Sequence, residues 1–144
     1  MTVEIRQTDD LATCLDLRRV VFIEEQGVSL ADEQDGRDGD ALHLLALLDG
    51  RPVGTARLLR EGETGKIGRV CVLPDARGHG IGAALTRAGV EAFRAMPGVT
   101  RVKLGAQTHA MGLYAKLGFI ATGPVYDDAG IPHRDMVLSF AADA

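Results

Sequence analysis

The sequence of 144 residues has no apolar run of the length that a membrane-spanning helix needs, about 18 residues. Its N-terminus also lacks the basic segment followed by an apolar one that is typical of a secretory signal peptide. From these two absences we expect no membrane partner and a location in the cytoplasm. At this length we expect one domain, residues 1–144, which can bury about two thirds of the surface of its unfolded chain.

Cysteine is scarce as well, and acidic residues outnumber basic ones. The two cysteines, Cys14 and Cys71, are too far apart in the sequence to form a metal-binding motif, so we expect no metal and reduced thiols. The net charge of −4 argues against nucleic acid as a partner and weakly favours a cationic substrate such as an amine.

Hydrophobic periodicity and turn residues divide the chain into strands and helices. Helical spacing predicts helices at residues 11–25, 81–96 and 109–117. Strands are predicted at residues 3–6, 42–48, 52–59, 66–73, 101–107, 119–126 and 133–140. The order indicates an α/β mixed sheet with helices on its faces, and the connecting helix makes strands 66–73 and 101–107 a parallel pair.

Three glycines within five residues, Gly78, Gly80 and Gly82, stand between a predicted strand and the helix at 81–96. Glycine lets the backbone approach a ligand closely, and the free N–H groups of a helix start attract phosphate oxygens. With the cation of Arg77, this pattern predicts a pyrophosphate site. A nucleotide-binding P-loop would need a lysine after the glycines, and a dinucleotide fingerprint an acidic residue ending the next strand; the chain has neither.

The spacing Arg-x-x-Gly-x-Gly of Arg77, Gly80 and Gly82, preceded by Val-Cys-Val-Leu-Pro at 70–74, resembles the acetyl-CoA signature of the GNAT N-acetyltransferase superfamily. The order of elements resembles the GNAT fold over nearly the whole chain. The resemblance implies six to seven strands flanked by helices, with a splayed parallel pair at the centre. It also implies acetyl-CoA as cosubstrate, bound at Val70, Cys71, Val72, Arg77, Gly78, His79, Gly80, Ile81, Gly82 and Ala83. We expect the thiol of Cys71 to be packed rather than nucleophilic.

Further stretches strengthen the resemblance. Residues 114–119 resemble the Tyr-x-Lys-Leu-Gly-Phe element of the family, which implies that Tyr114 protonates the departing thiolate. A phenol and an alkyl thiol have similar pKa values, so this transfer is nearly balanced. Residues 17–26 and 125–136 resemble a narrower subgroup, the ElaA/YjcF-like acetyltransferases.

An acceptor amine must lose a proton before it attacks a thioester, and a carboxylate or histidine can take that proton. Glu25, at the end of the first helix, and His133, in the last hairpin, are the candidate catalytic bases. Gln26 and His43 are the candidate substrate-binding residues, although His43 fits a buried structural role equally well. In the acidic loop at 27–40, Asp35 and Asp40 are further candidates for the group that takes this proton. We interpret three other acidic residues of the loop as solvated surface: Asp32, Glu33 and Asp38.

The sequence therefore predicts an N-acetyltransferase that moves an acetyl group from acetyl-CoA to a primary amine of a small molecule or peptide, by direct attack in a ternary complex. Two alternatives stay open. One is a non-catalytic acyl-CoA-binding or sensing module of the same fold, and the other is a Rossmann-type dinucleotide protein. The acceptor and the acyl chain length are not specified, and a homodimer is compatible with a family in which paired chains are common.

Overall fold

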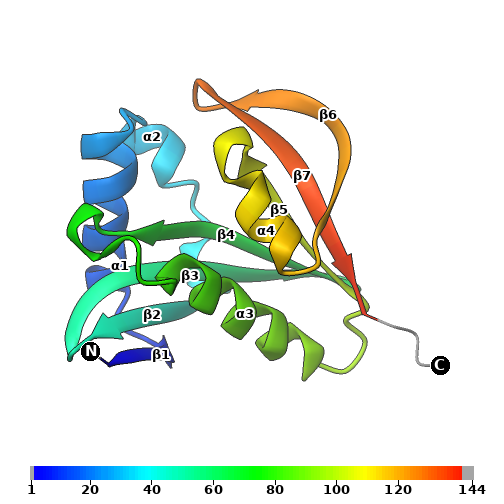
Figure 1. Ribbon diagram of the computed structural model, residues 1–144, viewed down its shortest axis with the longest axis horizontal. Helices are drawn as coiled ribbons and strands as arrows, with labels where there is room; N and C mark the ends of the chain where they lie inside the picture. Colours follow the sequence, from blue (N-terminus) through cyan, green and yellow to red (C-terminus); the bar gives the residue numbers. More distant parts are fainter. Residues whose placement is uncertain (1, 141–144) are drawn as a thin grey trace.

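Strand β2, Leu42–Leu48, is apolar except for His43 because helices cover both faces of the sheet. Leu44 and Ala46 pack in the cluster under one helix, whereas Leu45 and Leu47 pack with Cys14 on the opposite face. A strand buried on both sides has no polar face to alternate with its apolar one. This arrangement is seen in the computed structural model, which describes residues 2–140 (Figure 1).

The chain forms one seven-stranded sheet in the order β1-β2-β3-β4-β5-β7-β6. The remaining strands are β1 (Val3–Thr8), β3 (Arg51–Glu61), β4 (Thr64–Val72), β5 (Arg101–Gln107), β6 (Ile120–Asp128) and β7 (Ile131–Ser139). The α-helices are α1 (Leu11–Arg18), α2 (Leu30–Glu33), α3 (Ile81–Arg94) and α4 (Met111–Lys116). Short 3-10 turns occupy Asp38–Asp40, Pro74–Ala76 and Thr108–Ala110.

Strands β4 and β5 are the parallel pair, and they lie at the centre of the sheet. Their pairing covers three positions, from Thr64 opposite Arg101 to Lys66 opposite Lys103. Beyond these positions the two strands are no longer paired, which leaves one edge of the second half of β4 without a neighbour. The predicted mixed sheet with a splayed parallel pair is therefore confirmed.

Two glycines of the core set the position of helix α3 on this sheet. A Cβ atom at Gly65 of β4 would enter the ring of Phe93, and one at Gly89 would lie 2.8 Å from Cδ1 of Ile67. Because both positions lack a Cβ atom, the helix lies close against β4. This contact holds the C-terminal half of α3 against the first half of β4.

Helix α1 continues directly into a π-helical segment, Arg19–Glu25. The helix begins at Asp10, whose carboxylate accepts a hydrogen bond of 3.2 Å from the N–H of Thr13. The N–H of Gln26 bonds to the carbonyl of Val21, five residues earlier, at 3.1 Å. The extent of the helix agrees with the prediction, but its π-helical half was not predicted. Such segments are often found at functional sites.

The acidic loop is more ordered than the sequence indicated, and two of its residues correct our interpretation. Glu33 is 3% exposed and accepts a hydrogen bond of 2.8 Å from Nε of Arg18 and one of 3.0 Å from Nε of Arg69. Asp38 accepts one of 2.7 Å from Nη1 of Arg18. The prediction that Glu33 and Asp38 are solvated surface is therefore wrong, because three arginines from α1, β3 and β4 meet under this loop. Asp32 is exposed, as expected.

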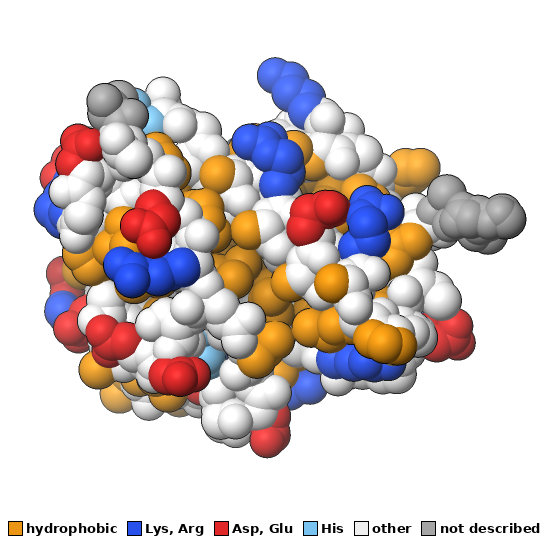
Figure 2. Space-filling model, turned by 90° about the horizontal axis from the view of Figure 1, so that it is seen from below, with side chains coloured by type: hydrophobic (Ala, Val, Ile, Leu, Met, Phe, Trp, Pro, Cys, Tyr) orange, Lys and Arg blue, Asp and Glu red, His pale blue; other side chains and the backbone are white. Residues whose placement is uncertain are grey.

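Charges of both signs are interspersed on the face seen in Figure 2, around a central group of apolar side chains. Within residues 2–140, no helix combines the length and the apolar character needed to cross a membrane.

Candidate active site

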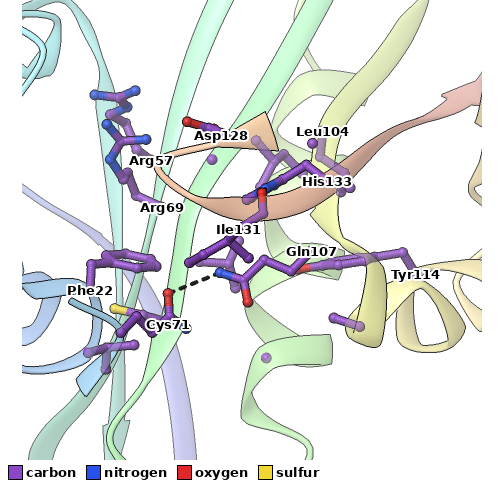
Figure 3. A pocket seen from close by; sticks show the side chains of 18 of the residues that line it. Phe22, Arg57, Arg69, Cys71, Leu104, Gln107, Tyr114, Asp128, Ile131 and His133 are labelled. Carbon is purple, nitrogen blue, oxygen red and sulfur yellow. Dashed lines mark hydrogen bonds between the residues drawn. The ribbon is translucent and has the colours of Figure 1, made fainter. Parts of the chain in front are cut away.

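A cleft of about 1030 Å³ opens where β4 and β5 diverge. Its walls come from the π-helical segment, the Gly-rich turn, both diverging strands, α4 and the β6–β7 hairpin. Figure 3 shows side chains from these distant segments pointing into one space. The splay is therefore the feature of the fold that creates room for a ligand.

The Gly-rich turn presents free backbone donors to this cleft. Gly78 and Gly80 have φ angles of +86° and +74°, which residues with a side chain rarely adopt. Helix α3 starts with the bond from the N–H of Ala84 to the carbonyl of Gly80, at 3.0 Å. Among the described residues, none accepts a hydrogen bond from the N–H groups of residues 78–83. The turn can therefore hold an anion at the positive end of the helix dipole.

Most of the residues predicted to bind acetyl-CoA line this cleft: Val70, Cys71, Val72, Arg77, Gly78, Gly80, Ile81, Gly82 and Ala83. His79 belongs to the same turn but is exposed and lies outside the lining. The predicted contribution of His79 to the acetyl-CoA site is therefore limited to its backbone N–H group.

Strand β4 carries a bulge immediately before the predicted pantetheine-binding residues. Thr55 pairs with Cys71 and Arg57 pairs with Gly68, so β4 has one residue more than β3 over this stretch. Arg69 lies in the bulge with a φ of +53°, an unusual value for a residue with a side chain. Its guanidinium group is fixed by Glu33, which holds the bulge in place.

The thiol of Cys71 points away from the ligand space, as expected for a packed residue. Cys71 is 4% exposed and belongs to the cluster under α1. Burial raises the pKa of this thiol to about 12, so a thiolate nucleophile is disfavoured at neutral pH. Its backbone, by contrast, follows the unpaired edge of β4.

Glu25 and Arg77 meet at the mouth of the cleft. Nη1 and Nη2 of Arg77 donate hydrogen bonds of 2.7 and 2.6 Å to the two carboxylate oxygens of Glu25. These bonds hold the pKa of Glu25 below its usual value, which makes the carboxylate a weaker base. The guanidinium group also donates to the carbonyl of Val72, at 3.1 Å, so it is tied to the end of β4.

A bridge of two amides crosses the splay. Nε2 of Gln107 donates a hydrogen bond of 3.0 Å to Oε1 of Gln26, and the ring of His109 lies 2.7 Å from Oε1 of Gln107. In Figure 3 the side chain of Gln107 reaches across the pocket, next to Tyr114. Gln107 was not among the predicted site residues.

Tyr114 lines the cleft from α4. Its ring meets the edge of Phe119 with centroids 6.2 Å apart, a contact that fixes the ring plane. Burial raises the pKa of this phenol above its usual value, so it keeps its proton at neutral pH. A buried phenol in this place can donate a proton or a hydrogen bond to a ligand atom.

The two predicted histidines have different surroundings. His133 of β7 lines the cleft, and its Nδ1 lies 2.8 Å from the carbonyl oxygen of Ile131. His43 lies outside the cleft lining; it is 7% exposed, with Nε2 3.0 Å from the carbonyl oxygen of Asp38. Of the two roles considered for His43, this position favours the buried structural one over substrate binding, because β2 is covered on both faces and this ring lies under the acidic loop.

Two arginines of the cleft wall were not predicted. Arg57 donates hydrogen bonds of 2.8 and 2.9 Å to the two carboxylate oxygens of Asp35, and Arg69 lies beside it (Figure 3). Hydrogen bonds from Arg57 lower the pKa of Asp35 well below its usual range, which makes it a poor base. Asp40 is exposed and is not part of the lining. No sequence motif marks these arginines, since each lies within an ordinary strand pattern.

Within the described part of the chain, no three His, Cys, Asp or Glu side chains are grouped to hold a metal ion.

Comparison with known proteins agrees with this geometry. A family model described as an acetyltransferase (GNAT) domain matches residues 21–140. Protein ElaA of Escherichia coli (strain K12) is 35% identical over 130 residues, which cover 88% of this chain and 85% of ElaA. YjcF of Bacillus subtilis (strain 168), described as an uncharacterized N-acetyltransferase, is 32% identical over 133 residues, which cover 92% of this chain and 94% of YjcF.

Solved structures show the same fold. The crystal structure of ElaA has a TM-score of 0.84 and covers 96% of this chain and 100% of that one, at 32% identity. An acyl-CoA N-acyltransferase from Pseudomonas aeruginosa has a TM-score of 0.82 at 34% identity, covering 96% and 99%. A Bacillus subtilis acetyltransferase solved in complex with CoA has a TM-score of 0.76; at 17% identity it shows the fold alone.

Proposed function

The chain belongs to the GNAT acetyltransferase family, and we propose that it transfers an acetyl group from acetyl-CoA to a primary amine. The observation that carries this proposal is the cleft at the splay, where a free strand edge and free helix-start N–H groups face one space. The strand edge can pair with the amides of an extended chain, and the helix start can bind a diphosphate at the end of that chain.

In this proposal, the diphosphate of acetyl-CoA lies on the N–H groups of residues 78–83, and its pantetheine arm follows Val70–Val72. The amide groups of pantetheine then take the place of a neighbouring strand along the unpaired edge of β4. Gly82 supports this placement, because a Cβ atom there would meet only Cδ2 of Leu113, at 3.8 Å, so the cleft in front of it is open.

The amine attacks the carbonyl carbon of the thioester, a C–N bond forms and the C–S bond breaks. We assign Tyr114 as the acid that gives its phenolic proton to the departing thiolate, since burial keeps that proton in place. We assign His133 as the base that takes a proton from the amine nitrogen. The products are an amide and the thiol of CoA; His133 releases its proton to solvent, and the phenol of Tyr114 regains one from solvent.

Nε2 of His133 is more available to accept a proton than the carboxylate of Glu25 in this geometry. The carboxylate of Glu25 is occupied by both guanidinium nitrogens of Arg77, whereas Nε2 of His133 accepts no hydrogen bond from a described residue. We therefore propose that Glu25 holds Arg77 at the diphosphate site. Gln26 forms the bridge with Gln107, which we place beside the reacting thioester.

A thermal-shift comparison followed by a thiol-release screen tests the proposal. Acetyl-CoA and CoA should raise the melting temperature, and NAD and ATP should not. Thiol release from acetyl-CoA should appear with at least one member of a panel of spermidine, glucosamine, lysine and a lysine-containing peptide. CoA binding without thiol release would favour a non-catalytic acyl-CoA module, and stabilisation by NAD alone would favour a dinucleotide protein.

A cytoplasmic location is part of the proposal. Its support is that Cys14 and Cys71 are free thiols, both buried, as suits a reducing compartment.

A further inference from the structure

The ring of His133 is held by two contacts that leave one nitrogen available. It stacks on the ring of Tyr126, its partner across strands β6 and β7, with centroids 5.9 Å apart and planes inclined by 25°. Its Nδ1 lies 2.8 Å from the carbonyl oxygen of Ile131. A carbonyl oxygen only accepts hydrogen bonds, so Nδ1 carries the hydrogen and the lone pair of the neutral ring is on Nε2.

Nε2 is the nitrogen that the cleft can reach. His133 lines the cleft, and Nε2 has no partner among the residues that the structure describes. Nδ1 of His43 is a buried polar atom without a hydrogen-bond partner within residues 2–140. Nε2 of His133 also lacks a partner there, but it is not buried. The fixed ring therefore presents its proton-accepting nitrogen to the ligand space.

Tyr126 is itself anchored at its far end. Its hydroxyl donates a hydrogen bond of 2.8 Å to Oδ1 of Asp135, and Nζ of Lys103 lies 3.3 Å from Oδ2 of the same carboxylate. Burial and the hydrogen bond to Asp135 raise the pKa of Tyr126 far above its usual value, so the hydroxyl stays a donor. Both oxygens of Asp135 are thus used to hold one ring in place.

Gly105 of β5 makes room for this anchor. A Cβ atom at Gly105 would lie 2.5 Å from the hydroxyl oxygen of Tyr126, closer than real Cβ contacts come. Any residue with a side chain would push the hydroxyl away from Asp135. Three neighbouring strands, β5, β7 and β6, therefore contribute to the position of one aromatic ring.

We infer that Tyr126 is a positioning residue for His133: anchored by Asp135 and Lys103 over Gly105, it holds the imidazole so that Nε2 faces the acceptor amine. This inference rests on the proposed function, because it takes His133 as the base. The competing interpretation is that Tyr126 only joins the strands of the hairpin. That interpretation predicts a change in stability and none in the tautomer of His133 or in the rate of the chemical step.

The tautomer is measured by NMR of the full-length chain labelled with ¹⁵N in its four histidines, with His133→Gln to assign the signal. We expect the wild-type signal to be that of a single tautomer with hydrogen on Nδ1. Tyr126→Leu should produce a mixture of tautomers. Gly105→Ala should shift the signal in the same direction while keeping the Tyr126 ring. Tyr126→Phe, which keeps the stacked ring but loses the hydrogen bond to Asp135, should give a signal between those of Tyr126→Leu and the wild-type protein. Val125→Ala, at a neighbouring exposed residue of β6, is the matched control.

Kinetics of thiol release separate positioning from folding. With the fastest acceptor of the spermidine, glucosamine, lysine and peptide panel, His133→Ala should lower kcat by about 100-fold. Tyr126→Leu should lower kcat by about tenfold, a loss of the size that misplacement of a catalytic group causes, with the KM for acetyl-CoA unchanged. Added to His133→Ala, Tyr126→Leu should cost nothing more, since the group that it positions is gone.

Two results would overturn the inference while the proposed function stands. One is that Tyr126→Leu lowers kcat equally in the wild-type protein and in His133→Ala. The other is an unchanged His133 signal in both Tyr126→Leu and Gly105→Ala. A wild-type protein that releases no thiol with any amine overturns the proposed function and the inference together. If Tyr126→Leu does not fold, Gly105→Ala and Tyr126→Phe decide the matter, because both keep an aromatic ring in the hairpin.

Discussion

Arg77 and Glu25 form two parallel hydrogen bonds, 2.7 and 2.6 Å long, although they lie 52 positions apart in the chain. The pair connects the Gly-rich turn to the end of the π-helical segment. Both side chains are well exposed, 44% and 38%, so the pair contributes only modestly to stability. A diphosphate at the turn would compete with Glu25 for the same guanidinium group.

Replacing Glu25 with Gln should strengthen the binding of CoA by about 1.4-fold to fivefold. This range corresponds to the free energy of an exposed ion pair, about 0.2–1 kcal/mol, which the ligand no longer has to overcome. Isothermal titration calorimetry of CoA measures the change, and Arg77→Gln is the matched control, for which binding should weaken. An unchanged or weaker affinity in Glu25→Gln would contradict the competition, and a kcat lowered by about 100-fold would assign the base role to Glu25 instead.

Gly82→Leu should weaken CoA binding at least about tenfold, or 1.4 kcal/mol, with no loss of thermal stability. The new side chain meets little protein, because only Leu113 lies near the position of the Cβ atom, but it fills the space in front of the helix start. The control is Gly112→Ala in α4, where no atom lies within 4 Å of the Cβ position. There we expect a gain of roughly 0.5–1 kcal/mol in stability and unchanged affinity. Normal CoA binding by Gly82→Leu would place the diphosphate elsewhere.

Tyr114→Phe should lower kcat for thiol release by about 100-fold and leave the KM for acetyl-CoA nearly unchanged. The phenyl ring can still meet the edge of Phe119, so packing is preserved. Because burial raises the pKa of Tyr114, its ionisation should not reduce the wild-type rate below about pH 10, the ordinary pKa of a phenol. The pH profile of kcat checks this. A variant with wild-type kcat would show that solvent protonates the thiolate.

The carboxylate of Asp38 should make the protein less stable in acid. Burial opposes the ionisation of Asp38, but hydrogen bonds and charge from Arg18 and Arg57 outweigh it and lower its pKa. A lowered folded-state pKa means stability that is present above the unfolded-state value, about 3.9, and lost as the pH falls below it.

Urea unfolding at pH 7, 5 and 3 measures this effect. The midpoint should fall between pH 5 and pH 3 in the wild-type protein, and by less in Asp38→Asn, which starts from a lower stability at pH 7. Asp40→Asn is the matched control, since Asp40 is exposed and in the same turn. Parallel pH curves for Asp38→Asn and the wild-type protein would rule out this source of acid sensitivity.

Local patterns were enough for most of the architecture. Strand β2 and strand β5 have the predicted bounds, 42–48 and 101–107. The mostly apolar sequence of β2 and the alternation of Val102, Leu104 and Ala106 in β5 report burial directly. Helix α3 begins at Ile81, where Gly80 in a left-handed conformation ends the turn. The GNAT assignment followed from the same kind of local signal, a short motif whose glycines and arginine have a physical reason.

The sequence by itself determined where the strands and helices lie and which turn has free N–H groups, because these properties depend on neighbours a few residues away. Only the tertiary structure decided which partners the charged side chains have and how the ring of His133 is oriented. Glu33 is buried between Arg18 and Arg69, Glu25 is bound to Arg77, and His133 is stacked on Tyr126. A side chain's pKa and orientation depend on what lies within a few ångströms in space, and no pattern along the chain records which distant residues those are.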